Sequence, residues 1–116
     1  MIRPWLVPFL LSMLLCSMPL LASEAGLSTQ AERSGYARTG RYAETIALCD
    51  AFAQRYPQAV RCFTFGTTPE GRPMQALAVS TSGALEAAAA QARKLPVVLI
   101  QGGIHAGEID GKDAGF

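Results

Sequence analysis

The sequence predicts an α/β fold with a mixed central sheet flanked by helices. Residues 42–56 carry apolar side chains at spacings of three and four, which is the period of an amphipathic helix. Residues 59–80 contain two segments rich in β-formers on either side of a turn, which indicates an antiparallel pair. Residues 96–103, PVVLIQGG, contain a continuous apolar run, typical of a strand buried on both faces in a sheet that helices cover.

The first 22 residues differ from the rest of the chain. Arg3 is their only charged residue, an apolar stretch follows it, and small residues close the segment, which is typical of a secretory signal peptide. We expect cleavage after Ala22, with Ala25 as the second choice. A membrane anchor is the alternative, because the apolar run nearly reaches spanning length. Two prolines interrupt that run and no basic cluster follows it, so we expect a periplasmic or secreted protein with no stable membrane insertion after cleavage.

The mature chain opens with a segment of little pattern and then a helix. Residues 23–38 are polar and small with no lasting period, and we expect them to form an exposed lead-in. Pro57 ends the helix that follows, because the residue before a proline is pushed out of helical geometry. The apolar face of that helix consists of Tyr42, Ile46, Cys49, Phe52, Ala53 and Tyr56.

The predicted strands at 59–66 and 73–80 are joined by the turn TPEG. Pro69 has the fixed φ that such a turn needs, and Gly71 stands at its closing position. Residues 84–94 are rich in alanine and predict a short surface helix without a functional signal.

Two cysteines remain after removal of the signal peptide. In an oxidising compartment Cys49 and Cys62 could form a bridge that closes a short loop and stabilises the fold by about 3 kcal/mol. Two buried free thiols, one on the helix and one on the strand, fit the same sequence, because free cysteine is a common core residue. The sequence leaves both alternatives open.

The charge of the chain is nearly balanced. Ten Lys and Arg residues are scattered among nine Asp and Glu residues, so no basic face is expected to neutralise phosphates. This composition argues against a nucleic-acid partner.

Chemistry-bearing residues follow the predicted third strand. His105 is the only histidine of the chain, Glu108 stands three residues later, and glycines surround both. Ligands of open α/β sheets bind beyond the carboxyl ends of strands. An imidazole and a carboxylate three residues apart can converge on one cation, and they suit zinc. A polar surface turn explains the same residues, and two ligands are fewer than zinc normally takes.

GGIHAGE after an apolar strand, preceded by FGTTPEGRPM, resembles the zinc carboxypeptidases of the funnelin type, peptidase family M14. In that family a helix and a strand lead into a G-x-x-x-E-G-R-P hairpin, and a later loop carries H-x-x-E. The resemblance runs from about residue 36 to the end. It implies that residues 39–116 are the truncated N-terminal part of a zinc carboxypeptidase-like catalytic domain. The hairpin residues that carry it are Gly66, Glu70, Gly71, Arg72 and Pro73.

The resemblance implies a zinc-dependent metallocarboxypeptidase that hydrolyses peptide bonds at the C-terminal end of peptide substrates. His105 and Glu108 would be the first two Zn²⁺ ligands, and Arg72 would line the cleft near the substrate. A second histidine ligand, an arginine for the substrate carboxylate and a glutamate base are expected downstream. No catalytic residue is therefore expected within these 116 residues, and the fragment alone should be inactive.

Three alternatives remain open. A zinc-dependent N-acyl amino acid deacylase of the succinylglutamate desuccinylase and aspartoacylase type shares the H-x-x-E pair. A serine hydrolase could use VVLIQGGIHAG as an oxyanion loop, but it would require G-x-S-x-G elsewhere and leaves EGRP unexplained. A metal-free binding module would need only a folded surface.

Overall fold

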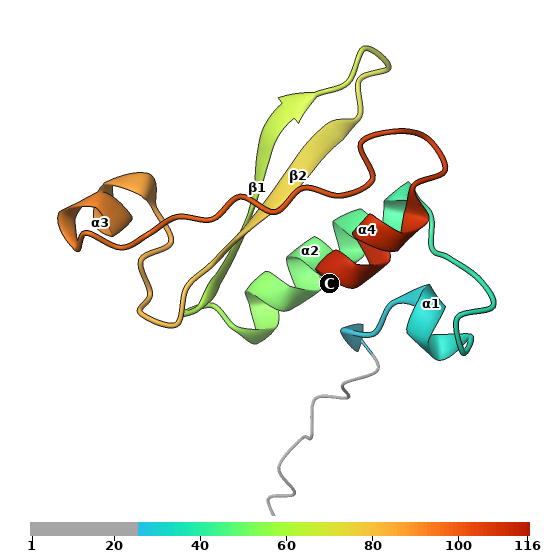
Figure 1. Ribbon diagram of the computed structural model, residues 1–116, viewed down its shortest axis with the longest axis horizontal. Coiled ribbons are helices and arrows are strands. Elements are labelled where there is room, and N and C mark those ends of the chain that lie inside the picture. The colour runs from blue at the N-terminus through green and yellow to red at the C-terminus, as the bar shows by residue number, and fades with distance from the viewer. Residues whose placement is uncertain (1–25) are drawn as a thin grey trace, which may run out of the picture.

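The computed structural model describes residues 26–116, and the predicted signal peptide lies outside the described residues. Helices and strands follow one another in an α/β order, which confirms the predicted fold class (Figure 1). In chain order the elements are α1 (Gln30–Arg33), α2 (Tyr42–Arg55), β1 (Val60–Thr67), β2 (Pro73–Val79), α3 (Ala87–Ala92) and α4 (Ile109–Gly115).

The sheet of the described chain is an antiparallel hairpin of β1 and β2. Its register runs from Val60 opposite Val79 to Thr67 opposite Pro73, with an irregularity between Thr64 and Gly66. Gly71 closes the turn at a φ of 80°, a left-handed conformation that glycine adopts without strain. The predicted hairpin and its turn are therefore confirmed.

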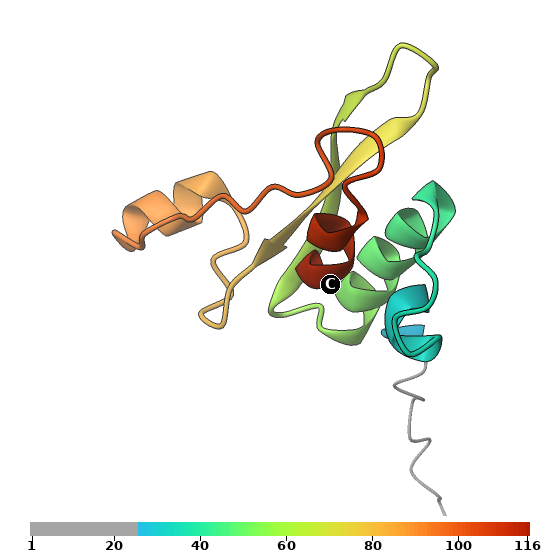
Figure 2. The same ribbon diagram turned by 45° about the vertical axis from the view of Figure 1, so that its right-hand side comes forward.

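Helix α2 packs against one side of the hairpin, and its interior face forms the centre of the core (Figure 2). Leu48 and Cys49 on α2 are 3% and 1% exposed, and Val60 at the start of β1 is 8% exposed. A disulfide bond joins Cys49 to Cys62 with their Cα atoms 5.4 Å apart. The bridge thus fastens the helix to the first strand, and the free-thiol alternative does not hold in this structure.

The predicted third strand does not form. Residues 95–104 run past the hairpin as an extended segment without strand pairing (Figure 1). The side chains of residues 97–100 are 79–85% exposed. A strand that is apolar on both faces needs neighbouring strands for its N–H and C=O groups and other elements over its faces. Within residues 26–116 this segment has neither.

The lead-in at 23–38, expected to be exposed and without a lasting period, contains one helical turn in its described part. Thr29 and Glu32 form a reciprocal cap: the Glu32 N–H donates to the Thr29 hydroxyl at 3.1 Å, and the Thr29 N–H donates to the Glu32 carboxylate at 2.7 Å. Thr29 is 1% exposed and Ala31 is 5% exposed. Helix α1 therefore adds buried surface at the N-terminal side of α2.

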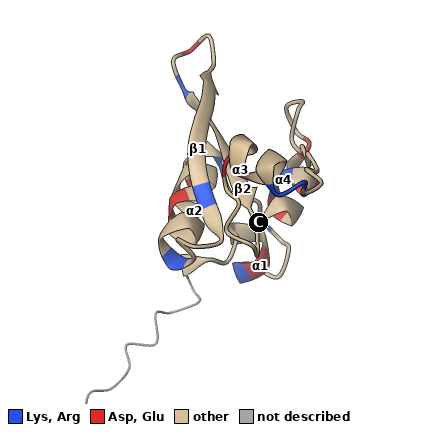
Figure 3. Ribbon diagram, turned by 90° about the vertical axis from the view of Figure 1, so that its left-hand side faces the viewer, with Lys and Arg blue, Asp and Glu red and all other residues tan. Residues whose placement is uncertain are grey.

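Charged residues are dispersed over several elements of the ribbon (Figure 3). Within residues 26–116, no helix is both long and apolar enough to cross a bilayer.

We predict that the disulfide contributes to stability. Replacing Cys49 and Cys62 together by alanine should lower the free energy of unfolding by about 3 kcal/mol, because the reduced chain gains loop entropy when it unfolds. Urea denaturation of the variant and the wild type measures this difference. Thiol labelling without reductant should modify neither residue in the wild type, and quantitative labelling of both in freshly isolated native protein would contradict the bridge.

Candidate metal site

The two predicted metal ligands meet in the loop between the extended segment and α4. His105 Nδ1 lies 2.8 Å from Glu108 Oε1, and the His105 backbone N–H donates to Glu108 Oε2 at 3.1 Å. Glu108 is the N-cap residue of α4, so the helix fixes its backbone. The side chains are 79% and 54% exposed, which leaves both ligands accessible.

Glycines give this loop its shape. Gly103 and Gly107 have φ values of 66° and 92°, in the left-handed region that favours glycine. The backbones of Gly102 and Gly111 lie in close contact. A Cβ atom at Gly102 would lie only 2.6 Å from the carbonyl group of Gly111, so the contact leaves no room for a side chain there. The loop therefore leaves the extended segment and returns to it within nine residues, with the ligand pair at its far end.

The carboxylate of Glu108 is held in its charged form. The hydrogen bond with the His105 ring, followed by that from the His105 backbone N–H, lowers the pKa of Glu108 below its ordinary value, against a smaller opposing effect of desolvation. A metal ligand must be deprotonated, so this environment favours the form that a cation needs.

A second cluster of polar side chains joins α4 to the rest of the molecule. Lys112 Nζ lies 3.1 Å from Glu44 Oε2 and also contacts the carboxylate of Asp113. The hydroxyl of Thr39 donates to Asp113 at 2.7 Å. No local spacing in the sequence predicts this cluster, because Glu44 and Lys112 stand 68 positions apart.

Arg72 lies at the hairpin turn, where it contacts Tyr42 and not the His105 and Glu108 pair. Its guanidinium carbon is 5.7 Å from the ring centroid of Tyr42, whose hydroxyl donates to the Pro73 carbonyl at 2.8 Å. Within the described chain no hydrogen bond or ion pair joins Arg72 to His105 or Glu108. Its role at the substrate remains a prediction.

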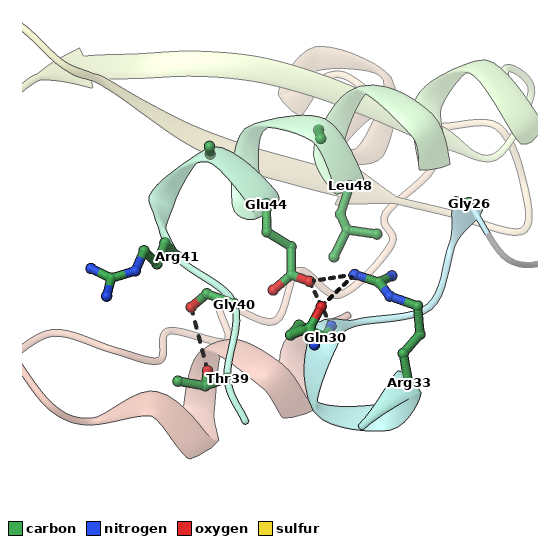
Figure 4. Close-up of a pocket in the computed structure, with 10 residues that line it drawn as sticks. Gly26, Gln30, Arg33, Thr39, Gly40, Arg41, Glu44 and Leu48 are labelled. Atoms are coloured by element: carbon green, nitrogen blue, oxygen red, sulfur yellow. Dashed lines mark hydrogen bonds and ion pairs between the residues drawn. The ribbon is translucent and has the colours of Figure 1, made fainter. Parts of the chain in front are cut away.

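A cavity of about 500 Å³ lies between α1 and the N-terminal part of α2 (Figure 4). Arg33 and Glu44 form an ion pair of 3.2 Å at its wall. Neither His105 nor Glu108 lines it, so the cavity is separate from the ligand pair.

The donor atoms of the pair fit zinc, but they are two of the three protein ligands that a catalytic zinc site uses. One imidazole nitrogen and one carboxylate converge at the end of an apolar segment. Within residues 26–116 no group of three His, Cys, Asp or Glu side chains is placed to hold a metal ion. The described residues therefore hold no complete metal site, and the pair supplies two candidate ligands.

An α/β scaffold with an H-x-x-E pair beyond an apolar segment is an arrangement expected of a metal-dependent hydrolase. Residues 45–116 match the family model for zinc carboxypeptidase, peptidase family M14, which covers most of the chain. The chain belongs to this family, as the hairpin and loop motifs predicted, and zinc is the metal that the family implies. Searches of curated proteins and of solved structures gave no significant match.

We predict that the attachment of α4 weakens in acid. The hydrogen bond from Lys112, opposed by desolvation and assisted by Thr39, lowers the pKa of Asp113 below its ordinary value. A lowered folded-state pKa stabilises the fold above the ordinary aspartate value of about 3.9, and this contribution is lost as the pH falls through the lowered pKa. Thermal unfolding of the wild type and Asp113→Asn should therefore differ at pH 7 and converge in acid. A difference that is independent of pH would contradict this assignment.

Proposed function

We propose that these 116 residues are the N-terminal part of a zinc-dependent metallocarboxypeptidase that removes residues from the C-terminal end of peptides. The observation that carries the proposal is the approach of His105 Nδ1 to within 2.8 Å of Glu108 Oε1, in a chain of the zinc carboxypeptidase family. Their position beyond an apolar segment supports a role at a substrate cleft.

His105 and Glu108 would hold the zinc ion through one imidazole nitrogen and one ionised carboxylate. Bound zinc supplies a Lewis acid that polarises the scissile carbonyl and lowers the pKa of a water molecule. The 116 residues contain a single histidine, so a second histidine ligand would lie outside them. The glutamate base and the arginine for the terminal carboxylate would also lie outside them, and these residues would contribute two ligands and scaffold.

Arg72 would contact the substrate from the hairpin turn. Its exposed guanidinium lies over the ring of Tyr42, which restricts the side chain to fewer orientations. A planar guanidinium presents paired N–H donors to a carboxylate or to carbonyl oxygens of a peptide. This geometry supports a role in substrate orientation.

The protein would act outside the cytoplasm. The disulfide between Cys49 and Cys62 supports this location, because such bonds persist in oxidising compartments. The signal-like pattern of residues 1–22 supports the same route.

The ligand assignment predicts that metal and activity are lost together. In the complete protein, His105→Ala or Glu108→Ala should remove bound zinc and reduce carboxypeptidase turnover by at least about a hundredfold, because a three-ligand site that loses one ligand rarely retains its metal. Metal analysis and turnover of a C-terminal peptide substrate measure both effects.

Asp110→Ala is the matched control. Asp110 is an exposed acid two residues from Glu108, and its loss should leave zinc and turnover near wild type. If His105→Ala kept stoichiometric zinc and normal turnover, the pair would be only a polar turn. Hydrolysis of N-acyl amino acids in place of peptides would favour the deacylase. The 116-residue chain alone should neither bind zinc tightly nor hydrolyse peptides.

The proposed export predicts a mature protein that begins near Ser23. Amino-terminal sequencing of material from the periplasm or the medium determines this directly. Recovery of that material with residues 1–22 still attached would contradict signal cleavage.

A further inference from the structure

The polar cluster that joins α4 to α2 lies one helical turn from the loop that carries His105 and Glu108. We call Thr39, Glu44, Lys112 and Asp113 the ionic clamp. The side chains of Glu44, Lys112 and Asp113 are 13%, 18% and 15% exposed, whereas the exposed pair of Arg61 and Glu86 has side chains 43% and 63% exposed. Partial burial strengthens the attraction between these charges, and breaking one partner leaves the other poorly solvated.

The clamp is fixed on the side of α2. Glu44 lies in the first turn of that helix, and its carboxylate accepts hydrogen bonds from the Gln30 N–H at 2.5 Å and from Arg33 at 3.2 Å (Figure 4). A Cβ atom at Gly40 would overlap this carboxylate, so the glycine leaves the space that Glu44 fills. Besides Lys112, two partners from α1 thus hold the carboxylate of Glu44.

The clamp is also close to the ligand loop. Lys112 stands four residues after Glu108, so one turn of α4 separates the clamp from the ligand that caps the helix. Gly111 beside Lys112 touches Gly102, which leads into the loop. A shift of Lys112 would therefore move both ends of the loop that carries His105 and Glu108.

The charges of the clamp support one another. Desolvation opposes the charge of Lys112, but hydrogen bonds and attraction from Asp113 and Glu44 outweigh it and raise the pKa of Lys112 above its ordinary value. The Lys112 ammonium therefore stays charged through neutral pH, which is the form that pairs with Glu44 and Asp113.

We propose that Glu44 and Lys112 are positioning residues for the metal site, which hold α4 on α2 and so fix the place of the His105 and Glu108 pair relative to the packed unit of α2 and the hairpin. This inference rests on the proposed function of the pair as zinc ligands. Partners that orient metal ligands affect metal affinity without touching the metal.

The test measures metal binding and local opening in the complete protein. Glu44→Gln and Lys112→Met remove one charge each. Each should raise the Kd for Zn²⁺ by about tenfold, the lower end of the effect of losing a partner that orients a ligand. The visible spectrum of bound Co²⁺ should change, and amide exchange of α4 in the metal-free protein should accelerate.

Two matched variants control for charge and for folding. Asp50→Asn removes an exposed carboxylate from the same helix as Glu44, and Lys112→Arg keeps the positive charge and the donors. Both should retain the Kd and Co²⁺ spectrum of the wild type. A merely structural role would lower the yield of folded protein but leave the Co²⁺ spectrum of the folded fraction unchanged.

Wild-type Zn²⁺ affinity and Co²⁺ spectra in both Glu44→Gln and Lys112→Met would overturn the inference. If Glu44→Gln failed to fold, Lys112→Met against Lys112→Arg would decide it, since these changes lie on α4. A wild-type protein that binds neither ion would refute the proposed function instead. In that case, unchanged amide exchange of α4 in the variants would also refute the clamp, whereas faster exchange would retain it as the device that positions the loop.

Discussion

The ion pair between Lys112 and Glu44 attaches the helix behind the His105 and Glu108 loop to the rest of the molecule. Helix α2 and the hairpin form one packed and disulfide-linked unit, whereas α4 follows a long extended segment that has no strand partner. Apart from the clamp, α4 ends on this unit through Phe116, whose ring lies 6.1 Å from that of Phe52. The position of Glu108 therefore depends on the polar contacts of the clamp in the middle of α4 and on one aromatic contact just beyond its end.

Local patterns predicted the part of the fold that local interactions build. The spacing of apolar residues and Pro57 gave α2 to within a residue at its end, and the TPEG turn gave the hairpin. Thr29 and Glu32 have the spacing of a capping box, so the start of helix α1 was also predictable from the sequence. The prediction of a third strand was wrong for another reason. An apolar run indicates that a segment needs burial, but the strands and helices that bury it can be far away in the sequence.

The candidate site likewise combines contacts that are local in sequence with contacts that are not. His105 and Glu108 stand three residues apart, so their meeting is a local event that the H-x-x-E spacing anticipated. The partnership of Glu44 and Lys112 is a tertiary event, and their residue types are those of any solvated surface. The two cysteines were an intermediate case, since their number suggested a bridge and only the packing of α2 on β1 brought their Cα atoms to 5.4 Å.

The extended segment at 95–104 has a consequence for how the protein must be handled. Its uncharged side chains at 97–100 are 79–85% exposed, and its backbone offers unused donors and acceptors along an open edge. Such an edge can pair with the same segment of another molecule. Lys94 and Pro96 oppose this pairing at one end of the segment only. Association of the 116-residue chain through this edge would then increase with protein concentration, and dilution should oppose it.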